Sequence, residues 1–335
     1  MTHEGDALRQ RLEAYVGKPL GSGGLARAPD PVNVPMIRHW VDALDDRNPV
    51  YLDAAIAAKS RFGGIVAPPA MLQTWTMSRP RIEGIAERGG APVEVDADTP
   101  LVALDREGYV GTLATNSELE FARYLRPGDR LAASAVVESI SERKTTALGL
   151  GYFVTWQTHY TDQAGAAVGR QLFRILKFQP GSSGSPRTAG AATTKKAAPA
   201  APEGERLPPF DLAVTSTVVV AGAIASRDFM PVHHDAEYAR AQGAPDLFMN
   251  ILTTNGYVSR YVTDWAGPEA GLRSIAIRLG APAVPGKTLR FSGQVARSVD
   301  RGGERLLEIA VHAANDLGPH ATGTVLLTLP AGDVR

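Results

Sequence analysis

Four segments of the chain have a pattern of polar and apolar residues that is typical of a β-strand. Two segments, Tyr124–Ile140 and Pro282–Val299, begin with a Pro-Gly turn, after which the alternation starts. The other two, Gly169–Pro180 and Ala321–Pro330, are rich in apolar residues and end at a proline. The strands therefore fall into two groups, one near the middle of the chain and one at its end.

Two further segments carry apolar residues at the spacing of an α-helix. The shorter is Pro68–Arg79, whose leading prolines suit the first turn of a helix. The longer is Asp246–Trp265, in which the following residues fall near a helical period: Phe248, Ile251, Leu252, Tyr257, Val258, Tyr261, Val262 and Trp265. Each helix precedes one group of strands, so we expect an antiparallel sheet packed on one side by a helix, formed twice.

This repeated order predicts an internal duplication of one α+β unit. We assign the early half to residues 1–180 and the late half to residues 206–335. Residues 181–205 contain no large apolar side chain and cannot offset the entropy of ordering, so we expect a flexible linker. The alternative, a long surface loop inside one domain, is unusual in a compact unit. The segment Pro80–Gly108 has no late counterpart and is expected to form a loop or hairpin at a cleft shared by the halves.

The composition excludes several classes of function. The 335 residues carry a formal net charge of zero, which argues against nucleic acid or an anionic membrane as the main partner. There is no cysteine, so disulfides, thiolate nucleophiles and cysteine-ligated metals are excluded. The first residues are polar and no apolar run reaches the length of a membrane helix, so we expect a cytoplasmic protein.

One short motif occurs in both halves, and its last residue differs between the two copies. The late copy runs from Asp228 through Pro-Val to His233, and the early copy runs from Asp46 through Pro-Val to Tyr51. A carboxylate beside an imidazole can act as a general acid and base pair, because histidine titrates near neutral pH. Tyrosine has a reference pKa of about 10 and cannot replace histidine in that task. We therefore expect an active late half and an inactive early half.

A purely structural interpretation of the late motif is also open. An aspartate before a helix is often only a cap, and Asp235 has that character, with Gly243 closing a short helix. An Asp and a His at this spacing also occur together by chance. The adjacent His234 is expected to be an exposed neighbour.

The two motifs resemble the signature of the MaoC-like (R)-specific enoyl-CoA hydratases and dehydratases, which reads Asp, any residue, Asn, Pro, an aliphatic residue, His. The late copy has Met230 in place of Asn, and the early copy has Tyr51 in place of His. The resemblance implies a double hot-dog fold of class α+β, in which each unit is a long helix wrapped by an antiparallel sheet. It extends over nearly the whole chain outside the linker.

Within this family the chain is similar to the actinobacterial steroid side-chain enoyl-CoA hydratases. The late runs "RDFMPVHHD", "FMNILTTNGYVSRYVTDWAGP" and "SIAIRLGAP" resemble their small subunit, and the early half resembles the MaoC-like part of their large subunit. The chain would then be a fusion of the two subunits. The extra module through which the large subunit recruits an aldolase has no counterpart here, so association with an aldolase is left open.

The resemblance also implies a mechanism and a set of site residues. Asp228 and His233 would add water reversibly to the double bond of an enoyl-CoA, and the backbone N–H of Asn250 would stabilise the enolate oxygen. Ala70 is the expected match to Asn250 in the early half. Candidate residues for holding the acyl group and CoA are Tyr51, Met71, Trp75, Met77, Arg123, Arg126, Arg278 and Lys287. The resemblance implies no cofactor besides the CoA of the substrate and no metal site. It also implies a homodimer of double hot-dogs.

Two other functions remain open at this stage. A hot-dog thioesterase usually places a carboxylate on the long helix. Asp246 is the candidate for that carboxylate, although its position is typical of a helix N-cap. A non-catalytic acyl-CoA-binding scaffold subunit would bind the ligand without turnover.

Overall fold

The computed structural model describes residues 3–21, 24–85, 87–93, 96–182, 204–301 and 303–330. Most of the expected linker, 181–205, therefore lies outside the described residues. None of the described helices combines the length and the apolar character needed to cross a membrane.

The early half contains five helices, two short 3-10 turns and six strands among its described residues. The helical elements are α1 (His3–Glu13), α2 (Val34–Leu44), α3 (Pro49–Leu52), α4 (Ala54–Lys59), η1 (Pro69–Met71), η2 (Thr74–Thr76) and α5 (Pro100–Arg106). The strands are β1 (Ala26–Arg27), β2 (Gly111–Phe121), β3 (Ala132–Ile140), β4 (Lys144–Thr146), β5 (Gly149–Thr161) and β6 (Ala167–Phe178).

The late half repeats this order with fewer elements. Its helical elements are α6 (Ser216–Ala225), η3 (Pro231–His233), α7 (Ala236–Ala241) and α8 (Ile251–Ala266). Its strands are β7 (Arg206–Val214), β8 (Gly271–Leu279), β9 (Lys287–Arg301), β10 (Glu304–Asn315) and β11 (Gly318–Pro330). The four strands predicted from alternation are confirmed as β3, β6, β9 and β11.

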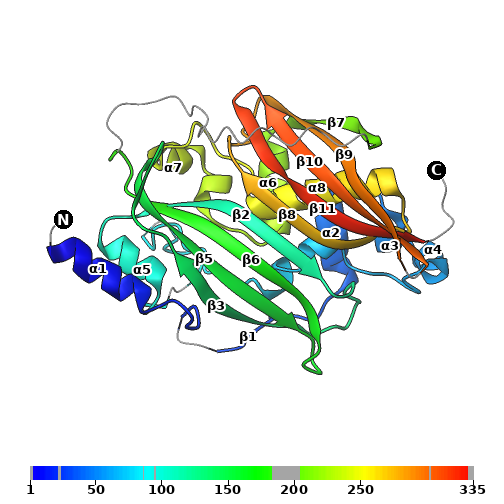
Figure 1. Ribbon diagram of the computed structural model, residues 1–335, viewed down its shortest axis with the longest axis horizontal. Coiled ribbons are helices and arrows are strands. Elements are labelled where there is room, and N and C mark those ends of the chain that lie inside the picture. The colour runs from blue at the N-terminus through cyan, green and yellow to red at the C-terminus, as the bar shows by residue number, and fades with distance from the viewer. Residues whose placement is uncertain are drawn as a thin grey trace.

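The described strands form one continuous antiparallel sheet. Its order is β1-β3-β5-β6-β2-β8-β11-β10-β9-β7, with β4 paired to β5 (Figure 1). The early strands and the late strands thus appear in mirrored order on the two sides of a central junction. At that junction Asn116–Glu120 of β2 pairs with Ser274–Arg278 of β8. The sheet itself therefore carries the repeat that the sequence predicts.

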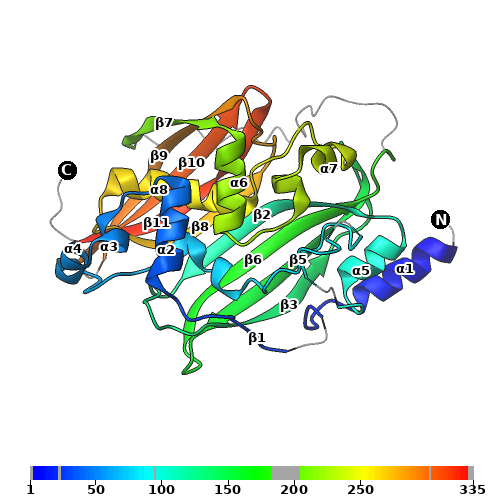
Figure 2. The same ribbon diagram turned by 180° about the vertical axis from the view of Figure 1, so that it is seen from behind.

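The helices that matter for function cover one face of this sheet. Figure 2 shows α2 and α6 side by side on that face, with α8 passing beneath them. Nearly every residue of α8 is buried, including polar ones such as Asn255 and Ser259, so this helix is the centre of the late half. It ends at Gly267, whose φ of 88° suits glycine.

The long predicted helix exists but begins later than expected. The expectation of a start at Asp246 was wrong, because Asn250 is the residue whose side chain caps the helix. Asp246 instead accepts a hydrogen bond from the Leu247 N–H and pairs with Arg240. The residues in between belong to no helix or strand, and the Met249 N–H donates to the Ala283 carbonyl at 2.9 Å. Asp246 is therefore not part of α8, which removes the feature that favoured a thioesterase.

The prediction of a helix over Pro68–Arg79 is wrong. Only the turns η1 and η2 form there, and their backbone hydrogen bonds span three residues, as in Leu72 N–H to the Pro69 carbonyl. Thr74, Trp75 and Thr76 all have modest helix propensity, so nothing local extends the first turn. The early half consequently lacks a counterpart of α8.

The segment Pro80–Gly108 forms a loop followed by α5 in its described part, rather than a hairpin. Its tip reaches the late half: a Cβ atom placed on Gly90 would lie 2.7 Å from the Tyr238 hydroxyl and 3.4 Å from Pro231. The loop therefore packs directly against η3 and α7, beside the late motif.

Candidate active site

The backbone of the late motif is set by the end of α6. Arg227 adopts a left-handed conformation with φ of 60°, and the Asp228 N–H then donates to the Ala223 carbonyl at 2.9 Å. The Asp228 side chain is thereby placed immediately after the helix, where its Oδ1 accepts the Met230 N–H at 3.4 Å. Pro231 opens the 3-10 turn that carries His233.

This local path brings the two predicted catalytic side chains into contact. The His233 Nε2 atom lies 3.3 Å from the Asp228 Oδ2 atom, and the two side chains are only 8% and 13% exposed. The His233 Nδ1 atom lies 2.7 Å from the Phe248 carbonyl, which can only accept, so Nδ1 carries a hydrogen. The edge of the imidazole packs against the Phe248 ring. His234, by contrast, is exposed, as the sequence predicted.

The electrostatics of the pair favour an imidazolium beside a carboxylate. Burial lowers the pKa of His233, but the Asp228 charge and the hydrogen bonds to Asp228 and Phe248 outweigh it, so the pKa lies above its usual value. Burial raises the pKa of Asp228, but His233, Asn250 and the Met230 N–H outweigh it, so the pKa lies below its usual value. The pair therefore holds one base and one acid side by side.

The side chain of Asn250 supports this arrangement in a way that the sequence did not reveal. Its Nδ2 group donates to Asp228 Oδ2 at 3.0 Å and to the Ser226 hydroxyl at 2.8 Å. Its Oδ1 accepts the Thr253 N–H at 2.8 Å and so caps α8. No described group accepts a hydrogen bond from the backbone N–H of Asn250. An asparagine just before an apolar helical run is a recognised cap signal, which could have indicated the capping role.

The early motif copies the backbone of the late one. Asp45 is left-handed with φ of 50°, and the Asp46 N–H donates to the Val41 carbonyl at 2.8 Å. Asp46 Oδ1 accepts the Asn48 N–H at 3.0 Å. Tyr51, in the place of His233, is 1% exposed and fully packed. The early half thus retains the frame of the site without its imidazole.

The hydrogen-bond register also corrects the match between the helix starts. The Ala67 N–H donates to the Leu125 carbonyl at 2.9 Å, as the Met249 N–H does to Ala283 in the late half. Pro68 therefore corresponds to Asn250, and the match of Ala70 was wrong. The separation of Tyr51 from Ala67 equals that of His233 from Met249, a signal that was available in the sequence. Proline has no backbone N–H, so the early half lacks the second element of the site as well.

Among the described residues, no hydrogen bond or ion pair joins the other candidate residues to Asp228 or His233. Met71 and Trp75 are buried in the early half, and the indole N–H of Trp75 has no partner among the described residues. Arg278 lies on β8 opposite Asn116, and Lys287 at the start of β9 pairs with Asp316. In the early half Met77 follows η2, Arg123 pairs with Asp129 and Asp162, and Arg126 donates to the Phe62 carbonyl.

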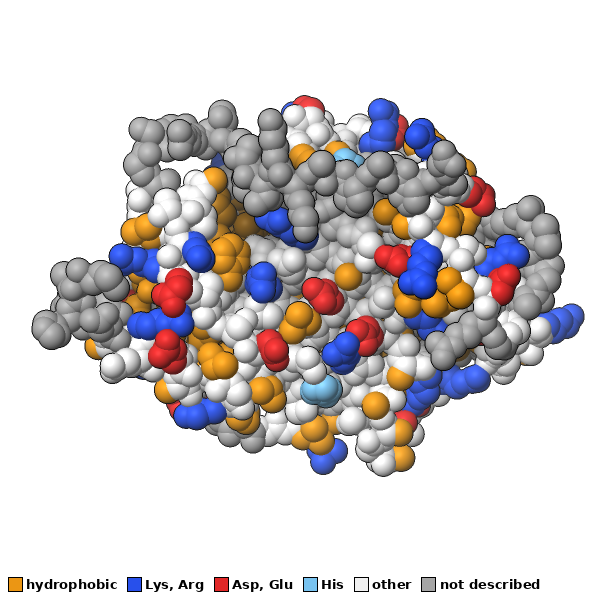
Figure 3. All heavy atoms as spheres, in the orientation of Figure 1, with side chains coloured by type: hydrophobic (Ala, Val, Ile, Leu, Met, Phe, Trp, Pro, Cys, Tyr) orange, Lys and Arg blue, Asp and Glu red, His pale blue; other side chains and the backbone are white. Residues whose placement is uncertain are grey.

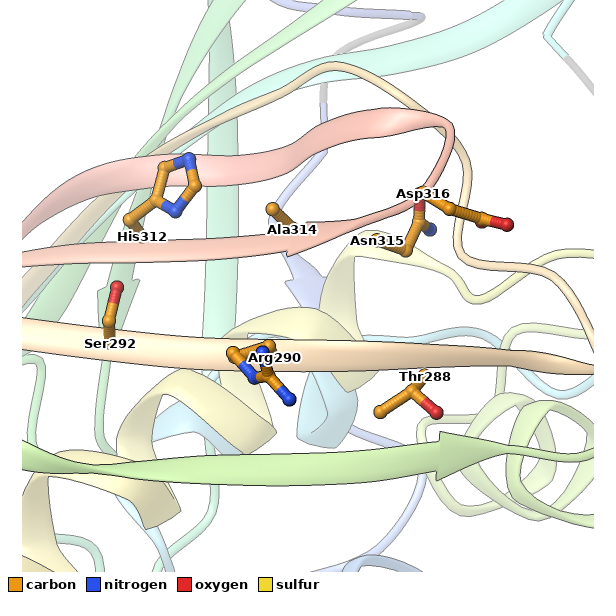
Figure 4. A pocket seen from close by; sticks show the side chains of 7 residues that line it. All are labelled: Thr288, Arg290, Ser292, His312, Ala314, Asn315 and Asp316. Carbon is orange, nitrogen blue, oxygen red and sulfur yellow. The ribbon is translucent and has the colours of Figure 1, made fainter.

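The late strands carry a hollow on their surface. A hollow of about 390 Å³ beside β9 and β10 is lined by residues such as Arg290, His312 and Asp316, and neither Asp228 nor His233 borders it (Figure 4). On the sheet face, acidic and basic side chains are intermingled (Figure 3). Within the described ranges, no group of three or more His, Asp or Glu side chains could hold a metal ion.

Comparison with known proteins matches each half of the chain to a family model. The family model described as a FAS1-like dehydratase domain region matches residues 24–171, and the model described as a MaoC-like domain matches residues 198–315. These matches confirm the resemblance drawn from the two motifs.

Three curated relatives carry hydratase names. A probable enoyl-CoA hydratase alpha subunit of Thermomonospora curvata is 46% identical over 52% of this chain and 53% of its own length. The alpha subunit of the 3-oxo-4,17-pregnadiene-20-carboxyl-CoA hydratase of Mycobacterium tuberculosis is 44% identical over 54% of this chain and 53% of its length. The beta subunit of that hydratase is 48% identical over 38% of this chain and 95% of its length. The chain spans about half the length of the two alpha subunits it matches.

Solved structures confirm the predicted α+β double hot-dog fold. A MaoC-like dehydratase superimposes with a TM-score of 0.69 at 23% identity, covering 95% of this chain and 99% of the other. A Mycobacterium tuberculosis protein described as having a double hot-dog fold superimposes with a TM-score of 0.59 at 14% identity, covering 93% and 96%.

Proposed function

Because the chain belongs to the MaoC-like dehydratase family, we propose that it is an enoyl-CoA hydratase acting through Asp228 and His233. The observation that carries this proposal is the buried contact of 3.3 Å between the carboxylate and the imidazole, at the start of α8. The proposed reaction is the reversible addition of water across the α,β double bond of an acyl-CoA.

The directions of the two pKa shifts support a separate role for each member. The Asp228 carboxylate accepts a proton from the water whose oxygen bonds to the β-carbon. His233 donates its Nε2 proton to the α-carbon. The product is a 3-hydroxyacyl-CoA, and the pair is left as a carboxylic acid beside a neutral imidazole. Direct return of the proton from Asp228 to His233 across their contact restores the starting state.

The start of α8 supplies the complementary electrostatics. As water adds, negative charge develops on the thioester oxygen. The backbone N–H of Asn250, at the positive end of a 16-residue helix, is the proposed donor to that oxygen. Pro68 offers no equivalent in the early half, which supports a single active site in the chain.

We propose that the early half, residues 1–180, holds the acyl group while the late half, residues 206–335, carries out the chemistry. The absence of a long helix at η1 and η2 supports this division, since Met71 and Trp75 occupy the corresponding position. Tyr51 closes the inactive motif. Arg278 and Lys287 are the proposed contacts for the CoA phosphates.

The proposed substrate is a bulky steroid side-chain enoyl-CoA. It is supported by the names of the two mycobacterial relatives, which are the alpha and beta subunits of a steroid carboxyl-CoA hydratase. The chain would then unite both kinds of subunit, joined through residues 181–205. A homodimer of double hot-dogs, a cytoplasmic location and the use of no cofactor beyond CoA belong to the same proposal. Association with an aldolase belongs to it as well.

Turnover with a steroid side-chain enoyl-CoA and with crotonyl-CoA tests the proposal. Loss of the enoyl absorbance is followed for the wild type and for Asp228→Asn and His233→Ala. Each substitution should reduce kcat by at least about 100-fold, because each removes a general acid or base. Ligand binding without turnover in the wild type would instead support a scaffold subunit, and CoA release from a saturated steroid thioester would support a thioesterase.

A further inference from the structure

A second histidine is buried behind the proposed active site. His320 lies on β11 and is only 2% exposed. Its Nδ1 atom lies 2.8 Å from the Ala281 carbonyl, and its Nε2 atom lies 3.0 Å from the hydroxyl of Thr254 on α8. The mechanism above does not use this residue.

The hydrogen atoms of this contact can be placed for a neutral His320 ring. The Ala281 carbonyl can only accept, so Nδ1 carries a hydrogen. Burial lowers the pKa of His320 more than the Ala281 hydrogen bond raises it, which keeps the ring neutral near pH 7. The Nε2 atom must then accept, and the Thr254 hydroxyl is its donor. Thr254 is thereby fixed to β11.

Thr254 connects this anchor to the active site. Its N–H donates to the Asn250 carbonyl at 3.1 Å, and this is the hydrogen bond that makes the connection. Its hydroxyl oxygen also lies 3.0 Å from that carbonyl, but its single hydrogen points to His320 when the ring is neutral. The side chain of Asn250 in turn holds Asp228 at 3.0 Å. A continuous chain of polar contacts therefore runs from the sheet, through the first turn of α8, to the carboxylate of the catalytic pair.

The inactive half provides an internal comparison. The Gly280 N–H donates to the His320 carbonyl at 2.9 Å, as the Ala122 N–H does to the Val168 carbonyl at 3.0 Å, so Val168 corresponds to His320.

Thr254 follows Asn250 by the same interval as Leu72 follows Pro68. The positions of Asn250, Thr254 and His320 are thus filled in the early half by a proline and two apolar residues, which are Pro68, Leu72 and Val168. This chain of polar contacts is therefore present in the half that has the proposed catalytic pair. It is missing from the described residues of the half that lacks the imidazole.

We propose that His320 and Thr254 are positioning residues, which hold Asn250 and through it orient Asp228 against His233. This proposal rests on the proposed hydratase function. A generic role in core packing would not require polar groups here, since the early half fills the same positions with valine and leucine.

Matched substitutions separate positioning from packing. Thr254→Val removes the hydroxyl at nearly constant volume, and Thr254→Ser retains it. His320→Gln keeps an acceptor that can reach Thr254, and His320→Val copies the inactive half. Thr328→Val is the control. Like Thr254, Thr328 is a buried threonine, but it lies on β11 and its hydroxyl donates to the backbone carbonyl of Gly271.

For Thr254→Val and His320→Val we expect kcat to fall by about 10- to 100-fold with little change in KM, because misplacement of a reacting group impairs the chemical step more than binding. Thr254→Ser and His320→Gln should recover most of the loss. Thr328→Val should keep wild-type kcat even where thermal unfolding shows a similar loss of stability. Equal kcat values for all variants, or losses that follow stability alone, would overturn the proposal.

The pKa of His233, measured by NMR of its imidazole, gives a readout that does not need turnover. Thr254→Val should lower this pKa relative to the wild type, because a loosened Asp228 stabilises the imidazolium less. If the wild type shows no hydratase activity but this shift appears, the positioning role stands and the proposed function fails. If the wild type is active and neither kcat nor the pKa changes, the positioning role fails alone.

Discussion

The carboxylates of Asp46 and Asp228 occupy the same backbone position in the two halves but meet different partners. Asp228 faces His233 and Asn250, which hold its pKa below the usual range. Asp46 has no imidazole beside it; burial is the main cause that raises its pKa to about 6, and the Asn48 N–H opposes this only in part. The same residue type is therefore the proposed catalytic base in one half and a source of instability in the other.

Substitution of Asp46 by asparagine should stabilise the protein at neutral pH. The folded pKa of about 6 exceeds the usual value of 3.8, so the folded state binds more protons between these values and loses stability as pH rises through that window. The neutral amide of Asp46→Asn would avoid this cost, and we expect about 1–3 kcal/mol of added stability at pH 8. Urea unfolding at pH 8 and pH 4 measures the effect.

The gain from Asp46→Asn should shrink toward zero at pH 4, where the aspartate is protonated in the folded state. A gain that is equal at both pH values would show that the buried carboxylate is not its source. Asp53→Asn is a useful comparison, because Asp53 is an exposed helix cap and its substitution should slightly destabilise the protein.

At the scale of elements, the catalytic loop depends on how closely α6 approaches α8. Gly222 lies on α6 one turn before Ser226, and a Cβ atom there would lie within 3.0 Å of three side-chain atoms of Thr253. Thr253 belongs to the first turn of α8, next to the Asn250 cap. The glycine thus permits the contact between the helix that ends at the motif and the helix that orients it.

Gly222→Ala should therefore both destabilise the fold and reduce activity. We expect a loss of about 1–3 kcal/mol, as for other overpacked sites, despite the better helix propensity of alanine. Urea unfolding and kcat with the steroid substrate measure the two effects. The control is Gly24→Ala, where a Cβ atom meets no heavy atom within 4 Å. A more stable and fully active Gly222→Ala protein would contradict the proposed close contact.

At the scale of the whole molecule, the halves are joined by structure rather than only by covalent connection. β2 and β8 complete one sheet, α2 packs on α6, and the loop at Gly90 lies against Tyr238 and Pro231. The Arg61 N–H and the Glu269 carboxylate add a hydrogen bond across the halves at 2.9 Å. The active site in the late half is therefore assembled against the early half.

Cleavage of the covalent connection should leave the enzyme intact. A protease site introduced between residues 183 and 203 would be cut, and the two pieces should elute together in size-exclusion chromatography with undiminished turnover. The reason is that the described contacts between the halves do not pass through that segment. Separation of the pieces, or loss of activity on cleavage, would refute a separable linker.

The sequence by itself determined the features that depend on local pattern. Alternation identified β3, β6, β9 and β11, and the repeated motif identified Asp228 and His233 against Asp46 and Tyr51. The helical period identified most of α8. These features are local because neighbouring side chains set strand and helix periodicity.

Only the tertiary structure decided the features that depend on contacts between distant segments. The start of α8 at Ile251, the missing helix at η1 and η2, and the match of Pro68 to Asn250 all follow from backbone pairing with other parts of the chain. The polar chain through Thr254 and His320 joins residues that no local pattern connects. Polar contacts affect stability more strongly when they are buried away from water. Which residues are buried depends on the folded chain as a whole.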